Sequence, residues 1–212
     1  MTVSERDERY HPDALEEEWS FAWWSRDEGG FTSYRLRRDA TAWYCWAWWR
    51  RGRPLLHVVE FDVIRRADPM IAKAEAMWAE FICESPMRQW TLGNETHAVE
   101  LDDPGEALGR VRGTLVPMAS DLEWYAEGAP ESRADGYTQR GVIVGDVETD
   151  EGPVAIVETA SVRAHRWSDR PLDHEWIPLV TAHLGPRLPF AFPDGRVLDL
   201  VLTPNGWCRR GG

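Results

Sequence analysis

The stretch "RAHRWS", residues 163–168, places an imidazole and an indole two positions apart, at His165 and Trp167. Residues two apart on a strand share a face, so these two rings would act together. An imidazole titrates near neutral pH, and His165 can therefore move a proton to or from an alkene, an enol or a carbonyl. Trp167 can stack on a polyene or stabilise positive charge through its ring. The competing interpretation is a histidine that is hydrogen-bonded within the wall of the fold.

Two other histidines, His57 and His97, fall beside tryptophans and could be combined with His165 into a three-histidine metal site. None of the three belongs to an HxH or HxxxH pair, which is the spacing that would support such a site. We therefore predict no metal site.

The cysteines and the common motifs argue against other familiar sites. Cys45, Cys83 and Cys208 are far apart and form no CxxC pair, so neither a cysteine zinc site nor a disulfide framework is expected. We interpret them as reduced structural thiols. The sequence also lacks GxGxxG, a P-loop, GxSxG and HExxH. We predict a protein without a cofactor.

The stretch "TAWYCWAWWRRGRP", residues 41–54, holds four of the 13 tryptophans. If residues 38–40 form a three-residue loop, antiparallel pairing sets Tyr34 opposite Tyr44. If Arg51 and Gly52 turn the next hairpin, Trp46 faces His57. One face of the predicted sheet then carries the following candidate ligand-binding residues: Tyr34, Tyr44, Trp46, Trp48, His57 and Phe61. A one-residue error in either turn would exchange the two faces.

A second aromatic group is predicted from "WAEFICESPMRQWTLGNETHAVE", residues 78–100. Tight turns at Ser85-Pro86 and at Gly93-Asn94 would set Phe81 opposite Trp90, and Trp90 opposite His97. We therefore add Trp90 and His97 to the candidate ligand-binding residues. The two groups could meet inside one closed barrel.

These aromatic residues have two interpretations. Most buried aromatic side chains only fill a core, because they contribute a large buried area. Small branched side chains fill a small barrel more easily than many large rings do, whereas rings suit the walls of an apolar pocket. Both interpretations stay open. Trp43 and Trp49 point to the opposite face, whose apolar band needs a cover, either the N-terminal segment or a second subunit.

Turn signals break the chain into short apolar or alternating runs, a spacing typical of antiparallel hairpins in a barrel or a sandwich. The length of 212 residues favours one domain, residues 1–212. Residues 1–18 form an acidic surface segment, in which Asp13 could cap a short helix. Short helices are also expected over residues 71–76 and at "DDPGEAL". The small and polar residues 127–136 predict a mobile loop.

Charge and hydropathy exclude several classes of partner. The net charge of -12 should repel phosphate backbones and anionic membrane surfaces, so we predict no binding to nucleic acid. No segment has the roughly 20 apolar residues that span a bilayer, and the first residues lack the apolar run of a secretory signal. We expect a cytoplasmic protein that does not bind membranes.

Four segments carry a resemblance to a known group: "HPDALEEEWSFAWW", "ATAWYCWAWWRRGRPLL", "FICESPMRQWTLGNETHAVELDDPGEAL" and "DLEWYAEGAP". Between about His11 and Trp167 the chain resembles uncharacterised, mostly actinobacterial proteins with lipocalin-like barrels. That group is related to the superfamily of carotenoid hydratases and fungal lipocalin-like Diels-Alderases. The resemblance implies a mainly β protein, an antiparallel lipocalin-like barrel with a few short helices.

The motif of this group resembles Arg-Asp-His-Ser-Trp-Gly, and "RAHRWS" matches it at Arg163, His165 and Trp167. The resemblance implies that these three residues are catalytic. The chain departs from the motif at Ala164, which removes the acid next to His165.

Together, residues and resemblance lead to a functional expectation. We expect a cofactor-independent cyclase of the Diels-Alderase type, or a related lyase or isomerase, acting on an apolar polyketide, polyene or isoprenoid in an aromatic cavity. An aromatic pocket can hold a flexible polyene in a near-attack shape without a strong nucleophile. The alternatives are a non-catalytic carrier of the same class of ligand and an interaction module whose outward aromatic band forms a homodimer.

Overall fold

The structure is a computed structural model that describes residues 3–25, 27–102 and 112–172, and the backbone of three strands after them. A 3-10 helix (Glu5–Glu8) precedes the strands. The strands are β1 (Glu16–Trp24), β2 (Glu28–Arg37), β3 (Thr41–Arg50), β4 (Leu56–Ile64), β5 (Ile71–Ala74), β6 (Met77–Ser85), β7 (Gln89–Leu101), β8 (Gly113–Ala126), β9 (Glu131–Arg133), β10 (Gly136–Thr149), β11 (Gly152–Ser168), β12 (Arg187–Ala191), β13 (Val197–Thr203) and β14 (Gly206–Arg209).

The predicted antiparallel β fold is confirmed, and its main sheet closes into a ring. The strands follow the order β4-β3-β2-β1-β11-β10-β8-β7, and β7 pairs again with β4. This last pairing is short, with Leu56 opposite Glu100 and His57 opposite Val99. Strands β6 and β5 continue from β7, whereas β12, β13 and β14 form a separate small sheet.

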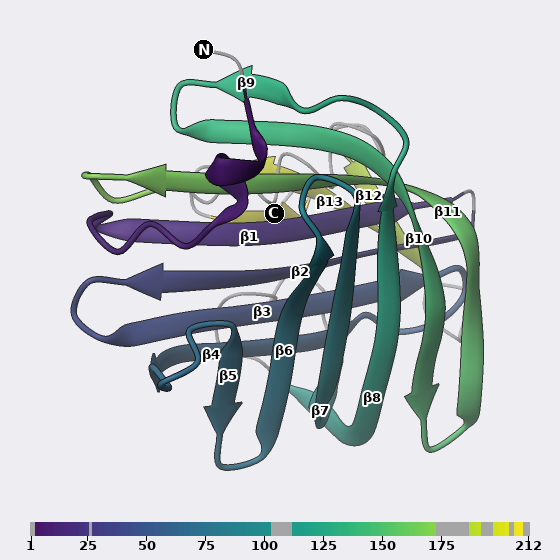
Figure 1. The fold of residues 1–212 in the computed structure, drawn as a ribbon. Helices are drawn as coiled ribbons and strands as arrows, with labels where there is room; N and C mark the ends of the chain where they lie inside the picture. Colours follow the sequence, from purple (N-terminus) through teal and green to yellow (C-terminus); the bar gives the residue numbers. More distant parts are fainter. Residues whose placement is uncertain are drawn as a thin grey trace.

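The ring is flattened into two layers whose strands cross steeply (Figure 1). Strands β1 to β4 make one layer and β5 to β8 the other, while the long strands β10 and β11 bend from one layer into the other. A bulge marks the bend, because Val157 and Glu158 on β11 oppose Val144 alone on β10. Bulges bend strands and increase their twist, which lets one strand serve both layers.

The predicted register of the first hairpin is confirmed. Residues 38–40 form the turn, with Tyr34 opposite Tyr44 and Thr32 opposite Trp46. Ala40 closes the turn with a φ of 66°, the left-handed conformation that a three-residue hairpin loop needs. Because the turn is tight, it fixes the register of the hairpin. This register decides which side chains of the two strands face inward.

The predicted register of the second hairpin is wrong by one residue. The connection runs from residue 51 to residue 55, and Trp46 pairs with Val58 instead of His57. A one-residue shift moves every side chain of the strand to the other face. His57 therefore lies on the outer face, and Phe61, which is 48% exposed, packs against outward-facing Trp43.

The predicted turn at Gly93-Asn94 is also wrong, because β7 runs through both residues without a break. His97 consequently lies on the same strand as Trp90 and points outward, where it is exposed. Phe81 pairs with Leu92, and Cys83 pairs with Trp90. Phe81 and Trp90 still share the inner face, as predicted.

The predicted short helices and the mobile loop require corrections. The segment after Asp13 is strand β1, and residues 71–74 are strand β5. The 3-10 helix lies earlier, where Ser4 and Asp7 form a capping box. Within the predicted loop, residues 131–133 form β9 and pair with β10. The sequence "DDPGEAL" lies almost entirely outside the described residues.

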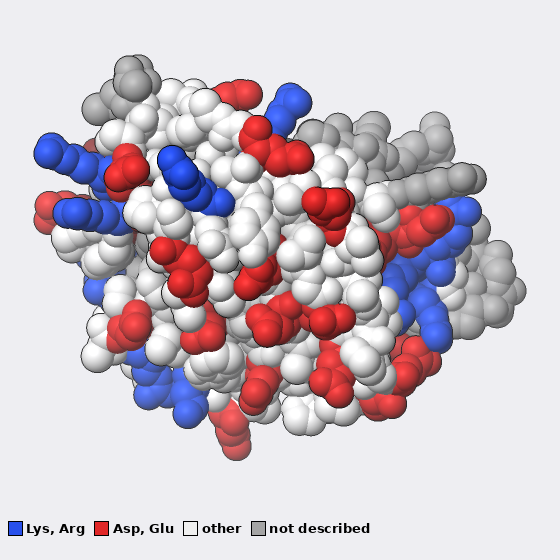
Figure 2. Space-filling view, turned by 45° about the vertical axis from the view of Figure 1, so that its right-hand side comes forward, with Lys and Arg blue, Asp and Glu red and all other residues white. Residues whose placement is uncertain are grey.

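The outer face of the second layer is acidic and solvent-facing. Figure 2 shows carboxylates spread over this side of the molecule, with few basic groups among them. Glu95, Asp121, Asp146 and Glu148 point outward from β7, β8 and β10 and are exposed. Among the described residues, no helix is long and apolar enough to cross a membrane.

Two glycines on the inner face make room for large rings. The ring of Trp23 lies across Gly30, and the ring of Trp124 lies across Gly141. A Cβ atom at position 30 would fall 2.2 Å from the Trp23 ring. Trp23 is 0% exposed, and its ring occupies the place that a side chain at position 30 would take.

We expect Gly30→Ala to lower the free energy of unfolding by about 1–3 kcal/mol, the usual cost of overpacking a tight core. The measurement is urea unfolding followed by tryptophan fluorescence. The control is Gly128→Ala, because a Cβ atom there meets nothing within 4 Å. Equal stability of the two variants would contradict the packing described for Trp23.

Candidate functional site

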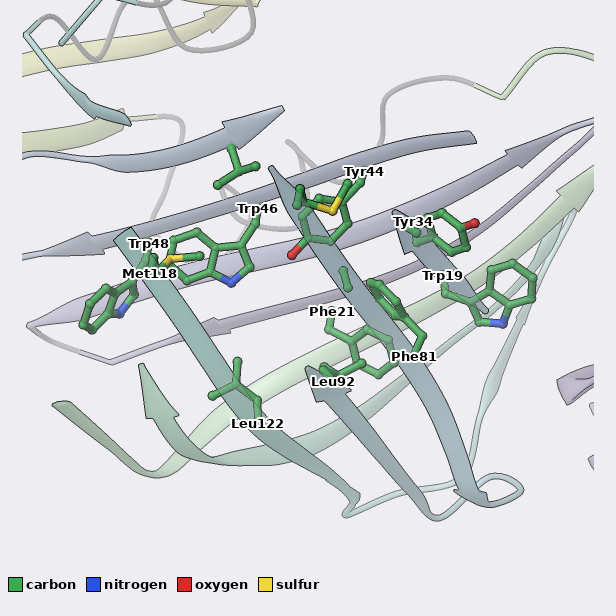
Figure 3. Close-up of a cluster of buried hydrophobic side chains, with 14 of the residues drawn as sticks. Trp19, Phe21, Tyr34, Tyr44, Trp46, Trp48, Phe81, Leu92, Met118 and Leu122 are labelled. Atoms are coloured by element: carbon green, nitrogen blue, oxygen red, sulfur yellow. The ribbon is translucent and has the colours of Figure 1, made fainter. Parts of the chain in front are cut away.

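The inner face of the ring forms a buried aromatic group, which we call the aromatic interior (Figure 3). Each of its side chains is at most 1% exposed. Its members are Trp19, Phe21, Trp23, Tyr34, Tyr44, Trp46, Trp48, Phe81, Trp90 and Trp124. The structure therefore brings five of the predicted ligand-binding residues together: Tyr34, Tyr44, Trp46, Trp48 and Trp90. Phe61, His57 and His97 are not among them.

The two tyrosines of the aromatic interior keep their protons and can serve as donors. Burial raises the pKa of both hydroxyls far above the ordinary value. Tyr34 donates to the Ile71 carbonyl at 3.3 Å, and the Tyr44 oxygen accepts from Asn94 Nδ2 at 2.7 Å. The Oδ1 atom of Asn94 is buried and has no donor among the described residues.

Most indole N–H groups of the aromatic interior lack an acceptor. No described residue accepts a hydrogen bond from the Nε1 atoms of Trp19, Trp23, Trp46, Trp90 and Trp124. We leave Trp48 out of this set, because its indole lies near the Glu28 carboxyl group. The unpaired indoles come from β1, β3, β7 and β8, so they are distributed over both layers.

A polar cluster closes one end of the aromatic interior. Arg163 on β11 forms a two-point ion pair with Glu8 of the 3-10 helix, at 2.5 and 2.8 Å. Gln139 accepts from Arg163 at 2.8 Å, and Tyr137 donates to Glu8 at 2.8 Å. Burial opposes ionisation of Glu8, but Arg163 and the other donors outweigh it and hold the pKa of Glu8 below its usual value.

The cluster continues into a chain of two histidines and one carboxylate. His165 Nε2 lies 2.7 Å from Glu17 Oε1, and His11 Nδ1 lies 2.9 Å from the same oxygen. Burial lowers the pKa of His165, although the Glu17 carboxylate favours its protonated form. Burial also opposes ionisation of Glu17, yet its hydrogen bonds to His11 and His165 lower its pKa. The arrangement is a neutral imidazole oriented by a carboxylate.

The polar cluster and the aromatic interior are in direct contact. Trp19 stacks on His165 with ring centres 4.7 Å apart, and Arg163 lies 4.9 Å from the centre of the Trp124 ring. The predicted common face of His165 and Trp167 is confirmed, with ring centres 5.0 Å apart. An apolar molecule among these rings would therefore meet hydrogen-bonding groups at one end.

Two surface depressions lie outside these groups, and neither is lined by a residue of the aromatic interior. One, of about 470 Å³, is lined by Tyr10, His11, Asp135 and Trp167, and its wall is the stacked pair of His11 and Trp167 with ring centres 4.1 Å apart. The other, of about 580 Å³, includes Met77 and Met118 in its lining. Both methionines belong to the buried core, and Met118 lies beside Trp48 in Figure 3.

The carboxylate partner of His165 comes from a neighbouring strand. Position 164 offers no acid, but Glu17 on β1 lies beside His165 because Trp19 is the strand partner of that histidine. The pattern "EEEWSFAWW" contains the signal, since Glu17, Trp19, Phe21 and Trp23 alternate with other residues. No alternation of this kind marks Glu8, His11 and Tyr137 in the sequence, because only the tertiary structure brings them to the cluster.

The three ligand atoms of His11, Glu17 and His165 lie within 4.8 Å of one another, a grouping that could hold a metal ion. Two of the separations, 2.7 and 2.9 Å, are hydrogen-bond lengths. Ligands of a tetrahedral zinc ion stand about 3.3 Å apart, given bond lengths near 2.0 Å. The geometry is therefore that of a hydrogen-bonded chain. The histidines of the earlier metal hypothesis, His57 and His97, lie on the outer face.

The outer face of the first layer contains a second buried group of charges. Arg35 contacts Glu18 at 3.1 Å and Glu16 at 3.4 Å, and it donates to the Leu172 carbonyl at 3.0 Å. The N-terminal segment was one of the two covers considered for this face. Its residue Glu8 lies in the polar cluster, where it contacts Arg163. His57 is also buried on the outer face, with no described partner for either ring nitrogen.

The chain has no significant match among protein-family models, curated proteins or solved structures. Its class rests on its own geometry: an antiparallel ring of strands with an aromatic interior and a polar cluster at one end.

Proposed function

We propose that the chain is a lipocalin-like barrel protein that binds an apolar small molecule in the aromatic interior. We further propose that it acts on this molecule as a cofactor-independent cyclase, or as a related lyase or isomerase. One observation carries the proposal: Trp19 stacks on His165, so the aromatic interior and an oriented imidazole are in direct contact.

The aromatic walls would contribute by restricting the shape of a flexible substrate. Holding reacting atoms at near-attack distances replaces an improbable encounter by a prearranged one, which can lower a barrier by several kcal/mol. The rings of both layers pack together in the aromatic interior, so a folded polyene admitted between them would contact rings on two sides.

The polar cluster would contribute hydrogen bonds to the reacting groups. Glu17 holds His165 in one orientation, and Tyr137 lies 3.4 Å from the other ring nitrogen. A carbonyl at this end would be polarised by such donors, and the imidazole could exchange a proton with an enol. Arg163 and Trp167 take positioning roles in this proposal, since Arg163 is engaged by Glu8.

The ligand would enter beside Met77 and Met118. Methionine side chains are flexible and adapt to irregular shapes, so they can move aside more easily than the surrounding rings.

The second candidate function is a non-catalytic carrier of the same class of ligand. It is favoured by the complete burial of His165, which is 0% exposed and already hydrogen-bonded to Glu17. A histidine of this kind can simply anchor the N-terminal segment.

Turnover distinguishes the two functions. The small molecules extracted from the purified chain are identified by mass spectrometry, and the chain is then incubated with linear precursors of the compound found. For a cyclase or isomerase, we expect His165→Gln to lower the rate by about 10²- to 10⁴-fold, the usual contribution of an acid–base group. The control is Asp121→Asn, because Asp121 is exposed on the outer face of β8 and lines neither depression.

A carrier would give tight binding without a change in ligand mass, and His165→Gln would leave its affinity almost unchanged. Failure to bind any apolar compound would contradict both functions.

A further inference from the structure

The five unpaired indoles of the aromatic interior indicate the chemistry of its ligand. Trp19, Trp23, Trp46, Trp90 and Trp124 are each at most 1% exposed, and none of their N–H groups has an acceptor among the described residues. Leaving a buried donor unpaired costs about 1–3 kcal/mol. Native proteins contain only a few such groups per 100 residues, and each one requires an explanation.

The described side chains offer these indoles few free acceptors. Among the described side chains on the inner face, Asn94 Oδ1 is the unpaired buried acceptor oxygen. The indoles are placed on both layers, from Trp19 beside the polar cluster to Trp46 on β3. One bound molecule with several acceptor atoms could therefore contact donors on opposite walls.

The charge of the site restricts the type of acceptor. Arg163 is the basic residue of the polar cluster, and its charge is engaged by the Glu8 carboxylate at 2.5 Å. A carboxylate ligand would thus enter a buried space without a free cation among the described residues, at a large desolvation cost. Neutral oxygens do not carry that cost.

We infer that the aromatic interior binds a neutral molecule with several hydrogen-bond acceptor oxygens, of the ketone, quinone or ether class, in preference to a hydrocarbon of the same shape. The inference rests on the proposed function, since it requires that the interior admits a ligand. Among the ligand classes proposed above, we therefore expect oxygenated polyketide-like compounds to bind more tightly than hydrocarbon polyenes and terpenes.

Three tricyclic probes test this preference: anthracene, anthraquinone and anthracene-2-carboxylate. Anthracene and anthraquinone have nearly the same outline, but only the quinone has two carbonyl acceptors. We expect the full chain to bind anthraquinone about tenfold more tightly than anthracene or better, because each new hydrogen bond contributes about fivefold. We expect the carboxylate to bind no more tightly than anthracene. Affinities are measured by equilibrium dialysis.

Variants connect the preference to the indoles. Trp46→Phe removes one donor and keeps an aromatic ring, so anthraquinone should bind about fivefold more weakly while anthracene affinity changes less than twofold. Trp124→Phe should behave in the same way. Trp43→Phe is the matched control on the outer face, and it should change neither affinity. Retained anthracene binding also shows that the variants are folded.

The outcomes separate the inference from the proposed function. Equal or tighter binding of anthracene, or of the carboxylate, would overturn the inference and leave the small-molecule function in place. An equal loss of both affinities in Trp46→Phe would also overturn it, because ring packing rather than the N–H donor would then be responsible. Binding of none of the probes, together with no compound in the extract, would overturn the proposed function and the inference with it.

Discussion

Glu8→Gln is expected to lower the free energy of unfolding by about 3–5 kcal/mol, since removing one partner of a buried ion pair leaves an uncompensated charge. Arg163 is 1% exposed, and Glu8 contacts it at 2.5 and 2.8 Å. The amide of Gln cannot neutralise the guanidinium. It also has one acceptor oxygen in place of the two that accept from the Tyr137 hydroxyl and from the Met87 backbone N–H. The measurement is chemical unfolding at pH 7 followed by far-UV circular dichroism.

Two companion variants make this result interpretable. Glu5→Gln lies in the same 3-10 helix but is exposed, so it should change stability by less than about 0.5 kcal/mol. Combining Glu8→Gln with Arg163→Met should recover most of the loss, because an apolar side chain of similar length can replace a buried charge. A cost for Glu8→Gln no larger than that of Glu5→Gln would show that the N-terminal segment is not held by this pair.

The second large effect is a loss of stability in acid caused by His57. Burial lowers the pKa of this imidazole from its ordinary 6.5 to about 4. As pH falls below 6.5, His57 becomes protonated in the unfolded chain, whereas in the folded chain it is protonated only near pH 4. His57 therefore does not lower the free energy of unfolding above pH 6.5. Below this pH the free energy of unfolding decreases, and the loss due to His57 reaches about 3 kcal/mol near pH 4.

The variant His57→Leu isolates this effect. Glu8, Glu17 and His165 also have lowered pKa values and destabilise the fold in acid, but their contributions cancel in a comparison of the two chains. We expect the variant to be more stable by about 1 kcal/mol or more at pH 8, because both ring nitrogens of His57 lack partners. Its advantage should grow by about 3 kcal/mol at pH 4.

The control for this second prediction is His97→Leu. His97 is exposed on β7, so its replacement should not reproduce the gain in stability that we expect for His57→Leu. If the wild-type chain and His57→Leu lose stability in parallel between pH 8 and pH 4, His57 is not the buried neutral imidazole described above.

Turn length decides how far the register could be predicted from the sequence. Residues 38–40 form the expected three-residue turn, and the pairing of Tyr34 with Tyr44 follows. The next connection extends to residue 55, because Pro54 and Leu55 precede the strand instead of opening it. That extension moved His57 and Phe61 to the outer face, while Tyr44 and Trp46 kept their predicted side.

Glycine was a misleading turn signal in β7. Gly93 lies inside the strand, where a Cβ atom would stand 3.3 Å from Glu80 Cγ and 3.6 Å from the Trp78 ring. Neighbouring side chains from β6 lie close to this position, a tertiary contact that the local sequence does not show.

The polar cluster could be predicted only in part. The two-residue spacing of His165 and Trp167 correctly places both on one face of their strand. Their acidic partners come from an N-terminal segment whose charge is typical of an exposed surface. Glu8 is buried only because Arg163 and Tyr137 meet it there, and such long-range pairing leaves no periodic pattern in the sequence.

The central claim is that the aromatic interior, and no outer surface, receives the ligand. The most direct test is nuclear magnetic resonance of the chain labelled with ¹⁵N-tryptophan, titrated with anthraquinone, with indole signals assigned through single Trp→Phe variants. We predict that the indole N–H signals of Trp19, Trp46, Trp90 and Trp124 shift on binding, while those of outward-facing Trp43 and Trp49 stay in place. Shifts confined to the outward-facing indoles, or no shifts at saturating ligand, would contradict the claim.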